Sequence, residues 1–257
     1  MSMSQAPGAQ FDIGRVISTT IGLVSRNFVP FAILSLIFAG TPFLVLQLMM
    51  PGLIAGDPSM LTIVSLLGML VSMVGGVVLQ GALTRASVDD LSGAGVNLSN
   101  ALSGALVLFL PMLGLGILVA LGIMLGMILL IIPGVYLALC WAVAAPTLVV
   151  ERLGVVPSMR RSTALTQGHR WPILGLVVLF VVIVIIFNLV VGILIPGGAA
   201  AMMGLPGQEV SYVAIAVLAI AQVLTSMVAT AGIAAVYFEL RQVKDGLGVT
   251  DIAKVFS

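Results

Sequence analysis

The stretch GVVPSMRRSTALTQGHRWPILGLVVLF, residues 154–180, changes character near its middle. Its first half holds three arginines, the only histidine of the chain and several hydroxyl side chains. From Pro172 onward the sequence is apolar for about the 20 residues that a helix needs to cross a bilayer. The boundary predicts a membrane-spanning helix that leaves the bilayer beside a basic surface segment.

The composition of the whole chain predicts that lipid is its solvent. Of the 257 residues, 61% are hydrophobic and 7% are charged, whereas a soluble domain carries about 25% charged residues. The net charge of +1 is too small for the basic field that attracts nucleic acid, so we expect no nucleic-acid partner. A single cysteine, Cys140, rules out a disulfide framework. We expect neither a metal nor a cofactor.

Six apolar segments are long enough to be membrane-spanning helices, so the predicted fold is an all-α, polytopic membrane protein. They cover residues 28–50, 60–83, 105–132, 135–150, 172–195 and 210–238. The apolar run that follows Arg26 has no cleavage site of small residues, so we do not expect a signal peptide. We expect a disordered tail at 1–10, a single six-helix membrane domain at 11–245 and a short cytoplasmic tail at 246–257.

The distribution of charge predicts the orientation of the chain. With six spans, all ten lysines and arginines fall on the side that carries both termini. The opposite loops contain only Asp57 and Glu209. Because basic loops stay in the cytoplasm, both termini are predicted to be cytoplasmic.

Proline punctuation predicts an internal repeat. Pro30, Pro111 and Pro172 each open an apolar run, and Pro-Gly pairs at 51–52, 133–134 and 196–197 close these runs. A weakly amphipathic segment precedes each opening proline. The six spans therefore read as three parallel repeats, each an interfacial helix followed by a transmembrane hairpin. The alternative is that proline and Pro-Gly recur only because helices break at span ends.

Small residues indicate where the spans pack, because they let helix backbones approach in lipid. Gly122 and Gly126 form a GxxxG motif in the third span. The last span carries Ser226, Thr230 and Ala234 at four-residue spacing. We therefore expect the last span to be central.

One further pattern is a resemblance to a known family. The segment IIPGVYLALCWAVAAPTLVVERLGVVPSMRRSTALTQGHRWPILGL, residues 131–176, and the closing VYFELRQVKDG resemble bacterial six-helix membrane proteins related to the membrane domain of glycerophosphodiester phosphodiesterases. The resemblance implies six helices and the bacterial cytoplasmic membrane. It does not imply catalysis, since the phosphodiesterase chemistry of those proteins belongs to a separate soluble domain.

The basic segment after the fourth span is the candidate binding site. A guanidinium binds phosphate in a bidentate manner and hydroxyls can donate further hydrogen bonds, so the candidate lipid-phosphate residues are Arg152, Ser158, Arg160, Arg161 and Thr166. The competing interpretation is orientation of the chain plus generic attraction to anionic headgroups, worth about 1 kcal/mol per basic residue.

Acidic residues near the same membrane surface are candidates for charge pairing. Glu151 is expected to pair with Arg161 or Arg241 when lipid is absent, and Glu239 is a further candidate. No group of residues suggests catalysis, because His169 has no carboxylate close to it in sequence.

We therefore expect a non-catalytic integral membrane protein, not an enzyme, that serves as a lipid-interacting or scaffold module. Its expected partners are membrane phospholipids and other membrane proteins. The alternative is a transporter or lipid-translocating protein with a cavity between the hairpins, lined by polar side chains such as Gln80, Asn188 and Gln222.

Overall fold

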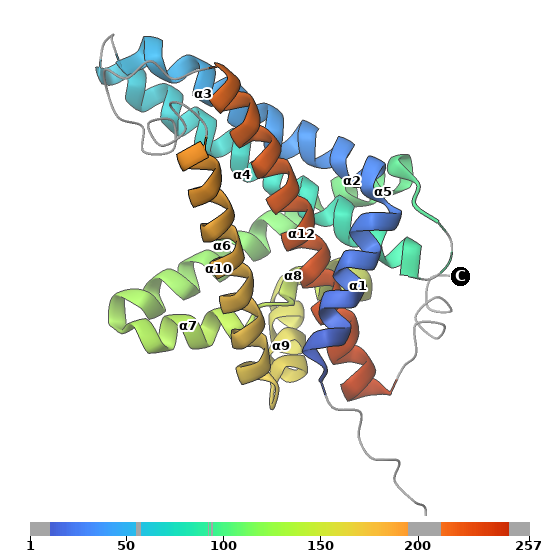
Figure 1. The fold of residues 1–257 in the computed structure, drawn as a ribbon. Coiled ribbons are helices and arrows are strands. Elements are labelled where there is room, and N and C mark those ends of the chain that lie inside the picture. Colours follow the sequence, from blue (N-terminus) through green and yellow to red (C-terminus); the bar gives the residue numbers. More distant parts are fainter. Residues whose placement is uncertain (1–10, 55–57, 92, 94, 195–211, 247–257) are drawn as a thin grey trace, which may run out of the picture.

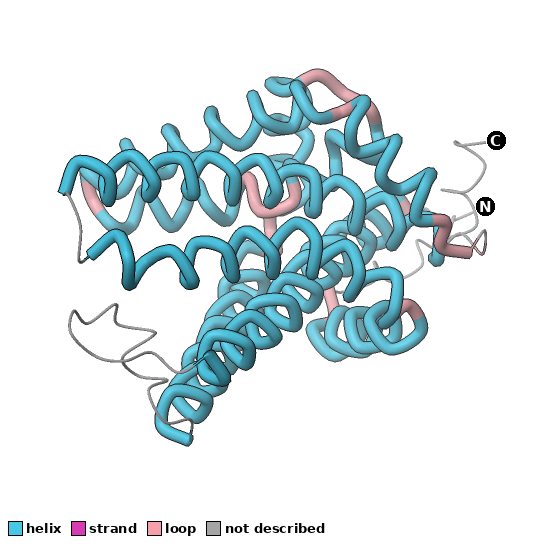
Figure 2. The backbone as a smooth tube through the Cα atoms, turned by 90° about the horizontal axis from the view of Figure 1, so that it is seen from above, coloured by secondary structure: helices cyan, strands magenta, loops and turns pink. Residues whose placement is uncertain are grey.

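The computed structural model describes residues 11–54, 58–91, 93, 95–194 and 212–246, and all regular structure in these ranges is helical (Figures 1 and 2). The predicted tail at 1–10, the predicted tail at 246–257 apart from Gly246, and the loop residues Asp57 and Glu209 lie outside the described residues. Within the described ranges, six helices are long and apolar enough to cross a membrane. The chain is thus an all-α, multi-pass membrane protein.

In chain order, the helices divide into three groups, one for each hairpin expected from the sequence. The first group is α1 (Ile13–Arg26), α2 (Phe28–Ser35), the π-helical η1 (Leu36–Gly40), α3 (Thr41–Ile54) and α4 (Pro58–Leu91). The second group is α5 (Leu98–Val107), α6 (Phe109–Leu129), α7 (Ile131–Cys140) and α8 (Ala144–Glu151). The third group is α9 (Val155–Thr166), α10 (Arg170–Leu194) and α12 (Tyr212–Asp245).

Several spans differ from their predicted bounds, and the last one, which was expected to end at residue 238, continues in α12 to Asp245. The second span was expected to end at residue 83, but α4 continues to Leu91. This extension carries Arg85 and Asp89, whose side chains form an ion pair of 3.3 Å one helical turn apart. The fourth span is interrupted, since the turn at residues 141–143 separates α7 from α8.

The amphipathic pattern at the start of the chain forms α1. Asp12 caps this helix, because its Oδ1 accepts hydrogen bonds from the backbone N–H groups of Gly14 (2.8 Å) and Arg15 (3.3 Å). The buried face of α1 contains Val16 and Leu23, and it packs against α12. The first described helix therefore packs against the last described one.

The last helix lies at the centre of the molecule. α12 contacts helices from all three groups, including α1, α4, α8 and α10. Alanines at its contacts, such as Ala231 and Ala234, are fully buried. In Figure 1 the α6–α7 pair runs across the direction of α10 and α12.

The second hairpin closes through glycine. A Cβ atom at Gly126 would lie 2.9 Å from the Cα of Gly134, and one at Gly134 would lie 2.8 Å from the backbone nitrogen of Met127. A Cβ at Gly122 would lie 2.5 Å from the Cζ3 of Trp141. The GxxxG glycines thus pack α6 against α7 and Trp141 within their own hairpin.

We predict that Gly134→Ala loosens this hairpin. The added methyl overlaps the Met127 backbone nitrogen, and such overpacking costs about 1–3 kcal/mol. The readout is the temperature at which Cys140, the only thiol of the chain and a buried one, reacts with a maleimide dye in detergent. Gly116→Ala in α6 is the control, because a Cβ there meets nothing within 4 Å. Equal reaction temperatures for the two variants would contradict the proposed close packing.

Candidate functional site

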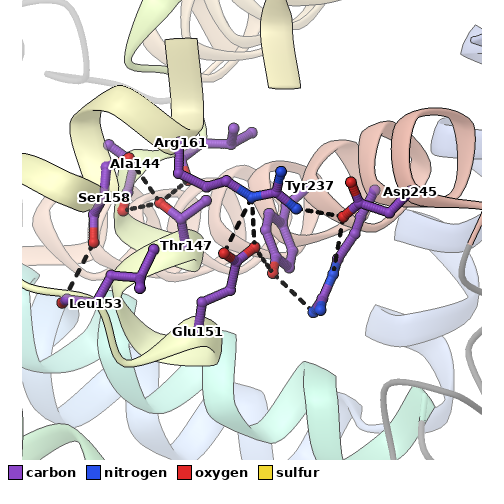
Figure 3. A network of polar contacts seen from close by, with 10 residues as sticks. Ala144, Thr147, Glu151, Leu153, Ser158, Arg161, Tyr237 and Asp245 are labelled. Atoms are coloured by element: carbon purple, nitrogen blue, oxygen red, sulfur yellow. Dashed lines mark hydrogen bonds and ion pairs between the residues drawn. The ribbon is translucent and has the colours of Figure 1, made fainter. Parts of the chain in front are cut away.

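Charged side chains from three helices converge where α8, α9 and α12 meet (Figure 3). We call Glu151, Arg161, Tyr237, Arg241 and Asp245 the arginine–carboxylate cluster. Glu151 ends α8, Arg161 lies in α9, and the other three lie in the last turns of α12. Two cations and two anions balance in the cluster, as partly buried charges require.

A sharp turn brings α9 beside the end of α8. Arg152 has a left-handed backbone conformation (φ 50°), which ends α8 and reverses the chain. Side-chain hydrogen bonds then fasten the helices: the Thr147 hydroxyl lies 3.2 Å from the carbonyl oxygen of Ser158, and the Ser162 hydroxyl donates to the carbonyl of Cys140 at 2.8 Å. Arg161 therefore projects from a helix whose position these hydrogen bonds fix.

Glu151 holds two members of the cluster. The Nε of Arg161 lies 3.2 and 3.1 Å from the two carboxylate oxygens of Glu151. The hydroxyl of Tyr237, a fully buried residue, donates to Glu151 Oε1 at 3.0 Å. The same hydroxyl accepts a hydrogen bond from Nη1 of Arg241 at 3.2 Å. A continuous chain of polar contacts therefore orients both guanidiniums.

Asp245 closes the cluster on its other side. Nη2 of Arg161 donates to Oδ2 of Asp245, and the Nε of Arg241 lies 3.5 Å from that same oxygen. Burial alone would lower the pKa of the Arg161 guanidinium, but the carboxylates of Asp245 and Glu151 outweigh burial and raise this pKa above its usual value. Arg161 is therefore a permanent cation here.

The two candidate hydroxyls of the basic segment face inward. Ser158 and Thr166 are fully buried. The Ser158 hydroxyl donates to the carbonyl of Leu153 at 3.5 Å. The Thr166 hydroxyl shares its proton between the carbonyl oxygens of Thr163 (3.3 Å) and Cys140 (3.5 Å). In this structure these hydroxyls take part in the packing of α9.

The four arginines of the segment have three different kinds of surroundings. Arg152 and Arg160 are exposed, and neither forms an ion pair with any described residue. The guanidinium of Arg170 instead stacks on Tyr136, with its carbon 4.5 Å from the ring centroid. Arg161 alone among these four is held by carboxylates.

Glu239 belongs to a second, separate ion pair. Its side chain is only 4% exposed and lies 3.2 Å from Nη1 of Arg15. It also accepts a hydrogen bond of 3.1 Å from the backbone N–H of Asp12. This contact fastens the start of α1 to α12.

Two other polar side chains are bonded locally or have no partner among the described residues. The Asn188 amide donates to the carbonyl of Val184 in its own helix. His169 Nδ1 is buried and has no hydrogen bond with a described residue. Within the described ranges, no three His, Cys, Asp or Glu side chains are grouped so that they could hold a metal ion.

Sequence reasoning missed two members of the cluster, Tyr237 and Asp245. The signal that could have found them is spacing: Tyr237, Arg241 and Asp245 are four residues apart and share one face of a helix. Their partners Glu151 and Arg161 are 84 to 86 residues away in the sequence, so the pairing itself is visible only in three dimensions.

We predict that Glu151→Gln destabilises the fold by about 1–3 kcal/mol, because it leaves Arg161 and Tyr237 without their charged acceptor. The measurement is again the temperature at which Cys140 becomes reactive. Asp90→Asn is the matched control, since the Arg26 side chain that it leaves behind is 58% exposed and surface ion pairs contribute about 0–1 kcal/mol. A Glu151→Gln protein as stable as the control would show that the cluster does not hold these helices together.

Comparison with known proteins places the cluster within a family. No curated protein and no solved structure matches the chain. The family model described as the membrane domain of glycerophosphoryl diester phosphodiesterase matches residues 117–246. This range contains half of the chain and the entire arginine–carboxylate cluster. The chain therefore belongs to the family of the membrane domain of glycerophosphoryl diester phosphodiesterase.

Proposed function

We propose that this chain is a non-catalytic, lipid-interacting module of the bacterial cytoplasmic membrane. The observation that carries the proposal is the exposure of Arg152 and Arg160 without ion-pair partners among the described residues. Trp171, which follows at the start of α10, is 82% exposed. Free guanidiniums beside an exposed indole suit the headgroup layer, where aromatic and basic side chains anchor a span.

The three groups of helices are proposed to be parallel repeats with both termini in the cytoplasm. In each group a short helix (α1, α5 or α9) precedes a pair of long apolar segments. The basic residues support a common orientation, because all those described lie in α1, in α9 or near the span ends beside them: Arg15, Arg26, Arg85, Arg152, Arg160, Arg161, Arg170, Arg241 and Lys244. Basic residues collect on the cytoplasmic side of a membrane.

The orientation predicts the outcome of a labelling experiment. In a Cys140→Ser background, an impermeant maleimide should label Ala164→Cys only from the cytoplasmic side and Asp57→Cys only from the opposite side. Ala164 is exposed on α9, and Asp57 lies in the sequence between the two spans of the first hairpin. Labelling of both positions from one compartment would refute the threading.

The proposed lipid interaction predicts that a protein without Arg152 and Arg160 retains less anionic lipid. Removing two basic residues at about 1 kcal/mol each should weaken retention of phosphatidylglycerol about tenfold or more in Arg152→Gln/Arg160→Gln. The measurement is native mass spectrometry of the protein extracted into mild detergent, with phosphatidylcholine as the zwitterionic reference lipid. Arg26→Gln is the control, since this exposed arginine is already neutralised by Asp90 at 2.7 Å. Unchanged retention in the double variant would remove the basis of the proposed function.

A further inference from the structure

The contact between Asp245 and the two arginines has the form of an occupied anion site. Arg161 Nη2 and Arg241 Nε both approach a single oxygen, Oδ2 of Asp245. Two guanidiniums that converge on one acceptor are a common means of binding a phosphate group. The acceptor here is supplied by the protein's own chain.

The two guanidiniums are held in place without help from Asp245. Glu151 binds the Nε edge of Arg161, and the Tyr237 hydroxyl binds Nη1 of Arg241. Arg241 is 8% exposed and Tyr237 is fully buried, so the surrounding helices fix both side chains. The donors that remain for an anion are therefore preorganised, which lowers the entropic cost of binding one.

Asp245 satisfies these donors incompletely. The Nε of Arg241 is buried and has no hydrogen bond among the described residues, because the Asp245 oxygen lies 3.5 Å from it. One carboxylate oxygen is shared by two donors. A tetrahedral phosphate offers several acceptor oxygens and can give each guanidinium its own.

Asp245 also occupies an unfavourable position for a carboxylate. It is the last residue of α12, where the negative end of the helix dipole disfavours an anion. Gly246, with φ 64°, ends the helix immediately afterwards. The Asp245 side chain is 21% exposed and that of Arg161 is 29% exposed, so an incoming anion can reach the site.

We propose that Arg161 and Arg241 form a phosphate-binding site in which the carboxylate of Asp245 holds the anion position until a phosphate-bearing ligand displaces it. The ligand class is a phosphate mono- or diester, carried by a lipid headgroup or by a small soluble molecule. In its lipid form the inference rests on the proposed lipid interaction, but it concerns different arginines from Arg152 and Arg160. Displacement would free the end of α12 from α9 while Glu151 keeps its hold on Arg161.

The test is binding of defined probes to Asp245→Asn, which removes the internal anion and keeps the shape of the side chain. Native mass spectrometry of the full chain in detergent would titrate inorganic phosphate, phosphatidylglycerol and phosphatidylcholine separately. Removal of the competitor should tighten binding of at least one anionic probe about fivefold or more, the scale of a typical coupling between two ligands. Arg161→Gln in the Asp245→Asn background should abolish the gain.

The different probes distinguish a lipid ligand from a soluble one. A gain for phosphatidylglycerol alone identifies a lipid headgroup, and a gain for inorganic phosphate identifies a soluble phosphate ligand. If Asp245→Asn binds neither phosphatidylglycerol nor inorganic phosphate more tightly, or if Asp90→Asn shows an equal gain in affinity, the inference is overturned. Retention of lipid through Arg152 and Arg160 can persist in that case, so failure of this site and failure of the proposed function are distinguishable.

The unmodified chain gives a second measurement should Asp245→Asn fold poorly. Inorganic phosphate or phosphatidylglycerol that binds the folded state raises the temperature at which Cys140 becomes reactive. This shift should be present in the wild-type protein and absent in Arg161→Lys, which loses the bidentate fork but keeps its charge. A shift of equal size in both proteins overturns the inference.

Discussion

The arrangement of the helices depends on charges that are desolvated at one end of α12. Glu239 and Arg241 are almost completely buried, and a buried charge without a partner is costly. Glu239 pairs directly with Arg15 of α1, whereas Arg241 pairs with Asp245 of its own helix and is linked to Glu151 of α8 through the Tyr237 hydroxyl. α12 cannot separate from these helices without leaving charges unpaired in a poorly solvated place.

The apolar parts of the chain contribute a different kind of contact. Most large side chains of α10 are exposed, with only Ile173 and Gly192 buried. In lipid this exposure carries no penalty, because there is no hydrophobic driving force between a helix and its neighbour. The helices are instead held by close backbone approach, as at Gly75, where a Cβ would lie 2.5 Å from the carbonyl oxygen of Phe38. Polar contacts at one end and glycine contacts along the helices thus share the task that a hydrophobic core performs in a soluble domain.

The sequence was most informative where the chain meets lipid. Length and hydropathy predicted six apolar helices because a bilayer has a fixed thickness, and helical spacing predicted α1. Hydropathy could not detect the turn at Trp141, since this break lies inside a continuous apolar run. Nor could it place the end of α4, where the Arg85–Asp89 pair lengthens the helix beyond its apolar part.

Only part of the candidate site could be predicted from the sequence. Basic residues near a span end are visible in the sequence, but their electrostatic partners are not. Arg160 and Arg161 are adjacent, yet helical geometry turns one to the exterior and the other toward Glu151 and Asp245.

Because Arg160 is exposed and Arg161 faces carboxylates, the two arginines interact with anions in different ways. The charge of an exposed arginine acts through a screened field that weakens with salt, so it recognises little beyond negative charge. The charge of Arg161 acts at short range among fixed partners, where the number and position of acceptor oxygens matter. Generic attraction and shape-dependent recognition can therefore reside on neighbouring residues of one short helix.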